Sequence, residues 1–156
     1  MMGKLQEHLM LREGFREEVY LDTLGKPTVG VGHLLTADEL QQYKVGDKVP
    51  KNILDEMFEK DVATAVEAAK KQITILGIES EDFEIALVSV NFQLGTRWYT
   101  KFPTAWKCLC HKKYGQAMDE IMFANIDTLK YSRWFKQTPV RVLDFLEAIF
   151  KIMKEA

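Results

Sequence analysis

The sequence has little cysteine and no long apolar run. Cys108 and Cys110 are its only cysteines among 156 residues, which excludes a disulfide framework. With His111 they could be imagined as a metal site, but no second ligand cluster completes a tetrahedron, so we expect neither a metal nor a cofactor. No window approaches the roughly 18 uncharged apolar residues of a membrane span, so we expect no stable membrane insertion.

The chain also has no large excess of charge of either sign, because its net charge is −2. Its distribution is uneven: residues 1–92 carry 10 Lys/Arg and 17 Asp/Glu, whereas residues 93–156 carry 11 and 6. The basic rear half could dock an anionic polymer, although a solvated face without a partner fits equally well. We expect no nucleic-acid partner, because neither a dense basic stripe nor a reading motif is present.

The first half of the chain mixes helical and extended patterns. Leu5 and Leu9 indicate a short amphipathic helix that ends before Gly14. Further on, β-favouring residues surround turn chemistry, and a capping box opens a second helix. The expected elements are a helix over 5–13, strands over 18–22 and 28–33 joined by a turn at 23–27, a helix from Thr36, and a third short strand or an irregular loop over 43–49.

The second half reads as helical, with glycine and proline near the element ends. Residues 52–72 place their apolar side chains on one face of a long helix. Thr138 followed by Pro139 is typical of an N-cap with proline at the first helical position. The further helices are expected over 83–94, 103–111, 115–125 and 139–154.

This order predicts an α+β chain, mostly α, forming a single domain over 1–156. A β-containing lobe over about 14–50 is joined by the connecting helix 51–72 to a larger helical lobe. That helical lobe comprises 78–156 together with 1–13.

Three polar residues stand near one another in this arrangement. Glu13 ends the first helix, Asp22 ends a strand at the lip of a turn, and Thr28 begins the returning strand. Two carboxyls and a hydroxyl facing one groove would suit glycoside hydrolysis, with one carboxyl as acid and the other acting through water or on the sugar. Taken singly, a helix-end Glu and a turn Asp are more often plain solvated residues.

The motifs around these residues are more specific than the spacing. Leu11–Arg16, Val19–Thr23 and Thr28–Thr36 contain a Glu, eight residues, an Asp, five residues, a Thr and then Gly-x-Gly-His. This resembles the active-site signature of the bacteriophage T4-type lysozymes, or endolysins, of glycoside hydrolase family 24. Weaker similarity continues in the segments 60–66, 91–95 and 132–141.

The resemblance implies a lysozyme-like fold and a muramidase. Such an enzyme cuts the β-1,4 bond between N-acetylmuramic acid and N-acetylglucosamine in peptidoglycan, usually with inversion. Glu13 would be the general acid, and Asp22 with Thr28 would hold the water or stabilise the cationic sugar. Inversion requires carboxyls roughly 6.5–9.5 Å apart.

The resemblance also implies supporting and substrate-contacting residues. His33 and Asp61 match a structural ion pair, and Arg141 matches an arginine near the catalytic Glu. For Gln93 we favour a polar contact to the sugar chain. For Trp134, a place in the core and a place in the cleft wall are equally expected, and for Phe92 we favour the core. The implied substrate-binding positions are Gly32, Leu34, Phe92, Gln93 and Trp134.

Two other functions remain open from the sequence. A lytic transglycosylase would need only one essential carboxyl, and a non-catalytic peptidoglycan-binding module of a phage tail would need none. No apolar stretch of secretory type lies in Met1–Glu7, so we expect no leader. The family resemblance then implies a monomer that waits in the host cytoplasm, is released through a holin and acts on glycan strands of the periplasmic wall.

Overall fold

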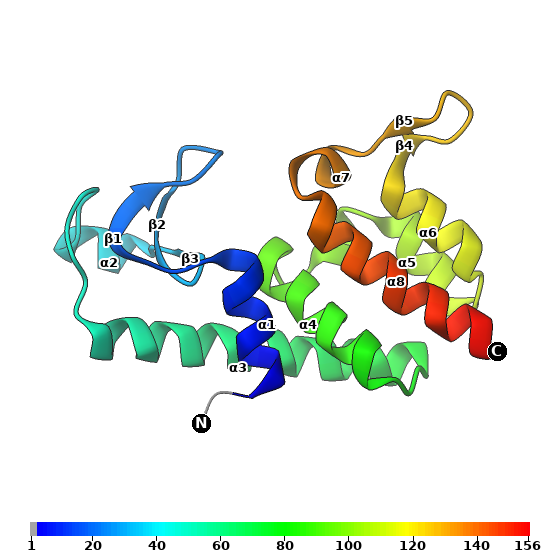
Figure 1. Cartoon of the computed structure of the whole chain (residues 1–156), viewed down its shortest axis with the longest axis horizontal. Helices are drawn as coiled ribbons and strands as arrows, with labels where there is room; N and C mark the ends of the chain where they lie inside the picture. The colour runs from blue at the N-terminus through cyan, green and yellow to red at the C-terminus, as the bar shows by residue number, and fades with distance from the viewer. Residues whose placement is uncertain (1–2) are drawn as a thin grey trace. The chain divides into compact units, whose positions relative to one another are not determined.

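The computed structural model describes residues 3–156 and divides the chain into two compact units, one ending at Thr64 and the other spanning Ala65–Ala156. The expected class, mostly α with a small antiparallel sheet, is confirmed (Figure 1). The first unit contains α1 (Lys4–Glu13), β1 (Arg16–Leu21), β2 (Pro27–Gly30), β3 (His33–Leu34), α2 (Ala37–Gln42) and the first part of α3 (Lys51–Leu76). The grouping of 1–13 with the helical lobe stays a prediction.

The second unit continues from the last part of α3. Its elements are α4 (Glu81–Leu94), the 3-10 turn η1 (Trp98–Thr100), α5 (Pro103–Cys110), α6 (Tyr114–Met122), β4 (Phe123–Asn125), β5 (Lys130–Tyr131), α7 (Arg133–Gln137) and α8 (Pro139–Glu155). Within residues 3–156 no helix is both long and apolar enough to cross a bilayer. Both cysteines lie in α5, Cys108 buried and Cys110 partly buried.

The sheet of the first unit has three antiparallel strands in the order β1-β2-β3. The single strand expected over 28–33 is wrong, because Gly30 and Gly32 take φ values of 65° and 60° and turn the chain between β2 and β3. These left-handed values favour glycine. The segment 43–49 is the irregular alternative, with one isolated bridge between Lys48 and Glu18.

A small apolar core lies between this sheet and the start of α3. Val19 of β1 and Val29 of β2 supply its sheet side, and Leu54 and Met57 of α3 cover it. Strand residues that alternate in and out, and helix residues spaced by three, produce these two faces. The core therefore holds the hairpin against α3, which gives the turns of the sheet a fixed support.

The core of the second unit is built around Trp98, which is fully buried. Its ring meets Phe145 of α8 edge-on at 5.8 Å. Its Nε1 donates to Gln72 Oε1 at 3.1 Å, and the Gln72 amide exchanges two hydrogen bonds with Asn91. Buried amides need such partners, so this network fixes α3, α4 and η1 together within the unit.

Two helix ends in this unit differ clearly from the predictions, and one cap lacks its side-chain bond. The helix expected over 115–125 ends at Met122, because 123–125 pair with 130–131 as a hairpin. The long helix expected to end at 72 continues to Leu76, where Gly77, with φ 65°, ends it. Pro139 does open α8, but the Thr138 side chain does not cap it. Thr138 Oγ1 instead donates to Trp134 O at 3.2 Å.

Candidate active site

Glu13 is the last residue of α1, and its carboxylate lies against the turn between β2 and β3. Gly14 follows with φ 75° and donates its N–H to Met10 O at 2.8 Å, which ends the helix. A β-carbon built on Gly32 would stand 2.6 Å from Glu13 Oε2 and 3.0 Å from its Cδ. A larger residue there would force the Glu13 carboxylate to move, so the glycine of the β2–β3 turn lets the Glu13 side chain approach the backbone.

Asp22 and Thr28 are brought together by one residue of the hairpin turn, Lys26. The Lys26 N–H donates to Asp22 Oδ1 at 2.8 Å, and the Leu24 N–H donates to the same oxygen at 2.9 Å. The Lys26 carbonyl accepts a hydrogen bond from Thr28 Oγ1 at 2.9 Å. Within residues 3–156, Asp22 Oδ2 accepts no hydrogen bond. One carboxylate oxygen is thus fixed by the turn.

Tyr20 of β1, which the sequence reasoning missed, is affected by the charges of both carboxyls. It stands opposite Thr28 in the register of β1 and β2, and Arg16 lies 4.2 Å from its ring centroid. Burial raises the pKa of the Tyr20 hydroxyl, Arg16 opposes this shift, and the charges of Glu13 and Asp22 raise the pKa further. The charges of both carboxyls therefore reach the same phenol.

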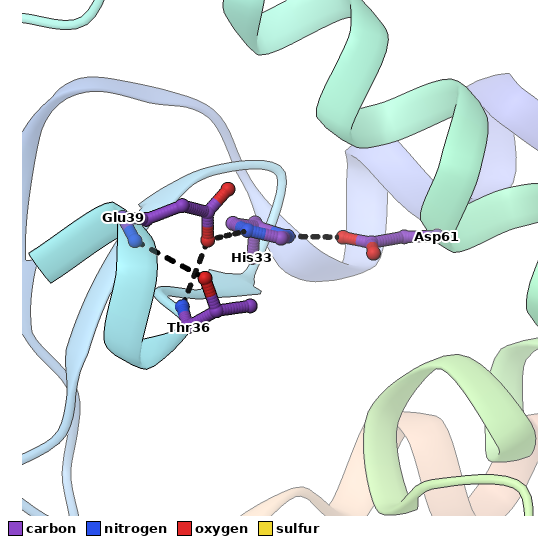
Figure 2. Close-up of polar contacts among 4 residues, drawn as sticks. All are labelled: His33, Thr36, Glu39 and Asp61. Carbon is purple, nitrogen blue, oxygen red and sulfur yellow. Dashed lines mark hydrogen bonds and ion pairs between the residues drawn. The ribbon is translucent and has the colours of Figure 1, made fainter.

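His33 joins β3 to two helices of the first unit. Its Nδ1 lies 2.6 Å from Asp61 Oδ2 of α3, and its Nε2 lies 2.8 Å from Glu39 Oε1 of α2 (Figure 2). Glu39 Oε1 also accepts the Thr36 N–H at 2.8 Å, while Thr36 Oγ1 accepts the Glu39 N–H at 3.2 Å. The capping box predicted from the sequence therefore ends in an ion pair with His33 (Figure 2).

These carboxylates keep the imidazole charged. The hydrogen bond to Asp61 raises the pKa of His33 to about 9, burial opposes this, and the bond to Glu39 adds to it. Burial alone would raise the pKa of the Glu39 carboxyl. The hydrogen bonds from Thr36 and His33 outweigh this effect and lower its pKa. Only 13% of the His33 side chain is exposed, whereas 32% of the Asp61 side chain is, so the imidazole is the better shielded partner.

The expected residues of the second unit form a group of their own. Gln93 Oε1 accepts from Trp134 Nε1 at 3.1 Å, and Gln93 Nε2 donates to Thr138 Oγ1 at 3.1 Å. Trp134 is 6% exposed, and its ring packs against Phe102 and Phe145. Trp134 is thus packed inside the unit, and both ends of the Gln93 amide bond to residues of the same unit. The expected contacts of these two residues with the sugar chain stay predictions.

The remaining expected residues are placed less specifically. Arg141 is buried, and its Nη2 donates to Ser89 O at 3.0 Å and to Ser89 Oγ at 2.8 Å. Phe92 is partly buried in α4, and half of the Leu34 surface is exposed. The approach of Arg141 to Glu13 stays a prediction, as do the contacts of Phe92 and Leu34 with substrate.

Three participants carried no clear signal in the sequence. The Lys26 contribution is purely backbone, so no side-chain motif could have revealed it. Glu39 had already been assigned to a capping box, and its second bond needs the positions of three elements. Tyr20 lies in β1 two residues before Asp22, which follows the end of that strand, and it belongs to no motif.

Two carboxyls and a hydroxyl at the turns of one small sheet are the chemistry of a glycoside hydrolase. Residues 11–130 match the family model described as Phage lysozyme, and the chain belongs to this family. It is therefore a lysozyme, a hydrolase of bacterial peptidoglycan, as the sequence motifs predicted.

Similar proteins agree with this assignment. "Probable T4-type lysozyme 2" of Dictyostelium discoideum is 30% identical over 161 residues, which cover 90% of each chain. "Probable T4-type lysozyme 1" of the same organism is 28% identical with the same coverage. The "Pre-baseplate central spike protein Gp5" of Enterobacteria phage T4 is 27% identical over 88% of this chain, but only 26% of that protein is covered.

Proposed function

We propose that Glu13 is the general acid of this muramidase and that Asp22 and Thr28 hold the attacking water. Glu13 would protonate the glycosidic oxygen between N-acetylmuramic acid and N-acetylglucosamine as the bond breaks. The observation that carries the proposal is the main chain of Lys26, which holds Asp22 by its N–H and Thr28 by its carbonyl. Two groups bound to the main chain of one turn residue are held close to one another, which positions a small ligand between them.

The direction of the Thr28 hydrogen bond supports the orientation of that water. Because Thr28 Oγ1 gives its proton to Lys26 O, its lone pairs can only accept from a ligand. A water that donates one proton to Thr28 and the other to Asp22 Oδ2 keeps a lone pair for the anomeric carbon. Such a water attacks the face opposite the leaving group, so the product anomer inverts. The carboxyls of Glu13 and Asp22 are then expected roughly 6.5–9.5 Å apart.

The remaining functional proposals concern the setting of the enzyme. The chain acts on glycan strands as a monomer, folds as a single lysozyme domain, waits in the host cytoplasm and reaches the periplasmic wall through a holin during phage-driven lysis. Gln93, Trp134, Phe92, Leu34 and Gly32 contact the sugar chain. Arg141 orients Glu13, and the His33–Asp61 pair supports the fold.

The test of the catalytic assignment is digestion of purified peptidoglycan by Glu13→Gln. The variant keeps the size of the side chain but cannot deliver a proton at the required acidity, so lytic activity falls by several orders of magnitude. Its melting temperature stays near that of the wild type. Glu17→Gln is the matched control, since Glu17 is an exposed carboxyl of β1 with only a 4.0 Å contact to Lys48, and it keeps full activity.

Product analysis in the same digestion tests the mechanism. An inverting hydrolase releases the α-anomer at first turnover. The product has a hydrated reducing end, because the elements of water are added across the broken bond. A 1,6-anhydro end, lighter by one water, would identify a lytic transglycosylase instead. Comparable digestion by Glu13→Gln would remove Glu13 from the role of acid, and no digestion by the wild type would leave a binding module.

A further inference from the structure

Three aromatic side chains form a continuous surface on the β4–β5 hairpin and the helix that follows it. Phe123 and Tyr131 stand opposite each other in the hairpin, with ring centroids 5.5 Å apart and an angle of 18°. Tyr131 meets Phe135 of α7 at 4.8 Å. We call Phe123, Tyr131 and Phe135 the hairpin platform. The hairpin extends from the end of α6 and leads directly into α7 (Figure 1).

The platform is held in place by one buried serine. Ser132 is 6% exposed, and its Oγ donates to Ile121 O of α6 at 2.8 Å and accepts the Phe135 N–H at 3.1 Å. Its own N–H donates to Met122 O at 2.8 Å. These bonds tie both ends of the hairpin and the start of α7 to α6. The three rings are therefore ordered before any ligand arrives, which lowers the entropic cost of binding.

The platform exposes the Tyr131 ring to solvent, and positive charge lies near it in the sequence. Tyr131 is 43% exposed, and Phe123 and Phe135 are partly buried beside it. Lys130, Arg133 and Lys136 are exposed, and residues 123–136 contain one acidic residue, Asp127. None of these three cations forms an ion pair with another residue of 3–156. An exposed aromatic patch with unpaired cations is typical of a binding surface rather than of a solvated face.

We propose that the hairpin platform is a second binding site for peptidoglycan, contributed by the second unit. The C–H groups on one face of a pyranose carry partial positive charge and stack on the negative face of an aromatic ring. The peptide stems of the wall carry carboxylates, which the three cations attract. A docking surface for a protein would instead favour an apolar centre depleted of lysine.

This inference rests on the proposed function only in that the substrate is a long polymer. One glycan strand carries many repeats, so the platform can hold it while the catalytic groups act on another repeat. The second contact then operates at high effective concentration and increases retention on the insoluble wall without changing the chemical step. A short fragment that fills only the catalytic groups gains nothing from the platform.

The experiment compares insoluble sacculi with a short soluble muropeptide as substrates. Tyr131→Ala is expected to reduce sedimentation with sacculi about five- to tenfold and to lower the rate of their digestion, with kcat on the short fragment unchanged. Tyr131→Phe keeps the aromatic ring at this position and is expected to bind sacculi as the wild type does. Phe150→Ala is the matched control, because Phe150 is an exposed aromatic of α8 with 46% exposure outside the platform, and it binds as the wild type.

A charge variant tests the same proposal without touching the rings. In Lys130→Ser with Lys136→Ser, we expect weaker binding and a smaller dependence of binding on salt, because fewer counterions are displaced. Lys154→Ser, in the last turn of α8, is its control. This pair lies on the surface, so it remains informative if Tyr131→Ala does not fold.

The outcomes separate the two proposals. Sacculi that are bound but not cut by the wild type would remove the proposed catalysis and leave the platform. Normal binding by Tyr131→Ala and by the double lysine variant would overturn the platform, as would an equal loss on sacculi and on the short fragment. Self-association of the wild type that Tyr131→Ala abolishes, with binding to sacculi intact, would assign the surface to a second copy and also overturn it.

Discussion

Gly32 lies directly against the carboxylate of Glu13, because a β-carbon on Gly32 would stand 2.6 Å from Glu13 Oε2. The glycine is needed twice, since its φ of 60° also belongs to the left-handed region. Backbone conformation and side-chain room are therefore set by the same residue. This relationship gives the first prediction.

Gly32→Ala is expected to reduce lytic activity at least tenfold, because the new methyl group displaces the Glu13 carboxylate. The left-handed φ should also cost about 1–2 kcal/mol in the free energy of unfolding. Gly46→Ala is the control, because Gly46 has φ 95° and nothing within 4 Å of a β-carbon. Turbidity assays and urea denaturation of both variants measure the two effects. Equal activity in the two variants would show that Glu13 tolerates the displacement.

Asp22→Asn separates the role of Asp22 in the stability of the hairpin turn from its proposed role in catalysis. The amide oxygen can still accept the N–H groups of Leu24 and Lys26, so the hairpin should lose less than about 1 kcal/mol. The charge is removed, however, and activity should fall by about two orders of magnitude or more. Asp22→Ala should lose the activity and about 1 kcal/mol more stability, because two N–H groups lose their acceptor. An active Asp22→Asn enzyme would mean that the charge is not required.

The His33 network predicts a dependence of stability on pH. Because the pKa of His33 is raised from 6.5 to about 9, its stabilisation is fully present below about pH 6.5 and is lost as the pH rises through about 9. The shift corresponds to about 3 kcal/mol, since one unit of pKa is about 1.4 kcal/mol. The lowered pKa of Glu39 adds a smaller loss in acid, below its ordinary value of 4.5.

The measurement is urea denaturation of the wild type and His33→Gln at about pH 6 and about pH 10. The difference between the two proteins should be large at the lower pH and should shrink at the higher one. His111→Gln, an exposed histidine at the end of α5, should show no such change. A difference that stays constant over this range would exclude a charged His33 as the source of the stabilisation.

Gln72→Leu tests the buried network of the second unit. Leucine removes the acceptor of Trp98 Nε1 and both bonds to the Asn91 amide, so buried donors and an acceptor are left without partners. The expected loss is about 2–4 kcal/mol in the free energy of unfolding. Thr74→Ala, at an exposed position of α3, should change stability by less than about 0.5 kcal/mol. Calorimetric melting compares them, and a small effect of Gln72→Leu would show that the unit repacks.

The sequence predicted the features that depend on local chemistry. The helix over 5–13, the helix opening at the Thr36 capping box and the long helix that carries Asp61 appear in the structure with ends shifted by a few residues. The pairing of His33 with Asp61 came from family resemblance, and the two side chains are in contact. Caps and apolar periods act over a few residues, which is why a single sequence reveals them.

Features that depend on distant partners were harder to predict. Val-Gly alternation over 28–33 fits a strand, but two left-handed glycines turn the chain there instead. Residues 123–125 were predicted as the end of a helix over 115–125, but they pair with 130–131, and this strand pairing outweighs the local helical pattern. Thr138 is the N-cap of α8 before Pro139, as predicted, although its hydroxyl bonds with Gln93 and Trp134 and not with the helix that it opens. Each error arises where a tertiary contact overrides a local preference.

The role of Lys26 has a consequence for variation at that position. It contributes through its main chain alone, giving an N–H to Asp22 and a carbonyl to Thr28. A saturation library at residue 26 should accordingly be permissive toward polar, apolar and acidic replacements. Proline alone lacks the required donor, so the one imino acid should be depleted under selection for lysis.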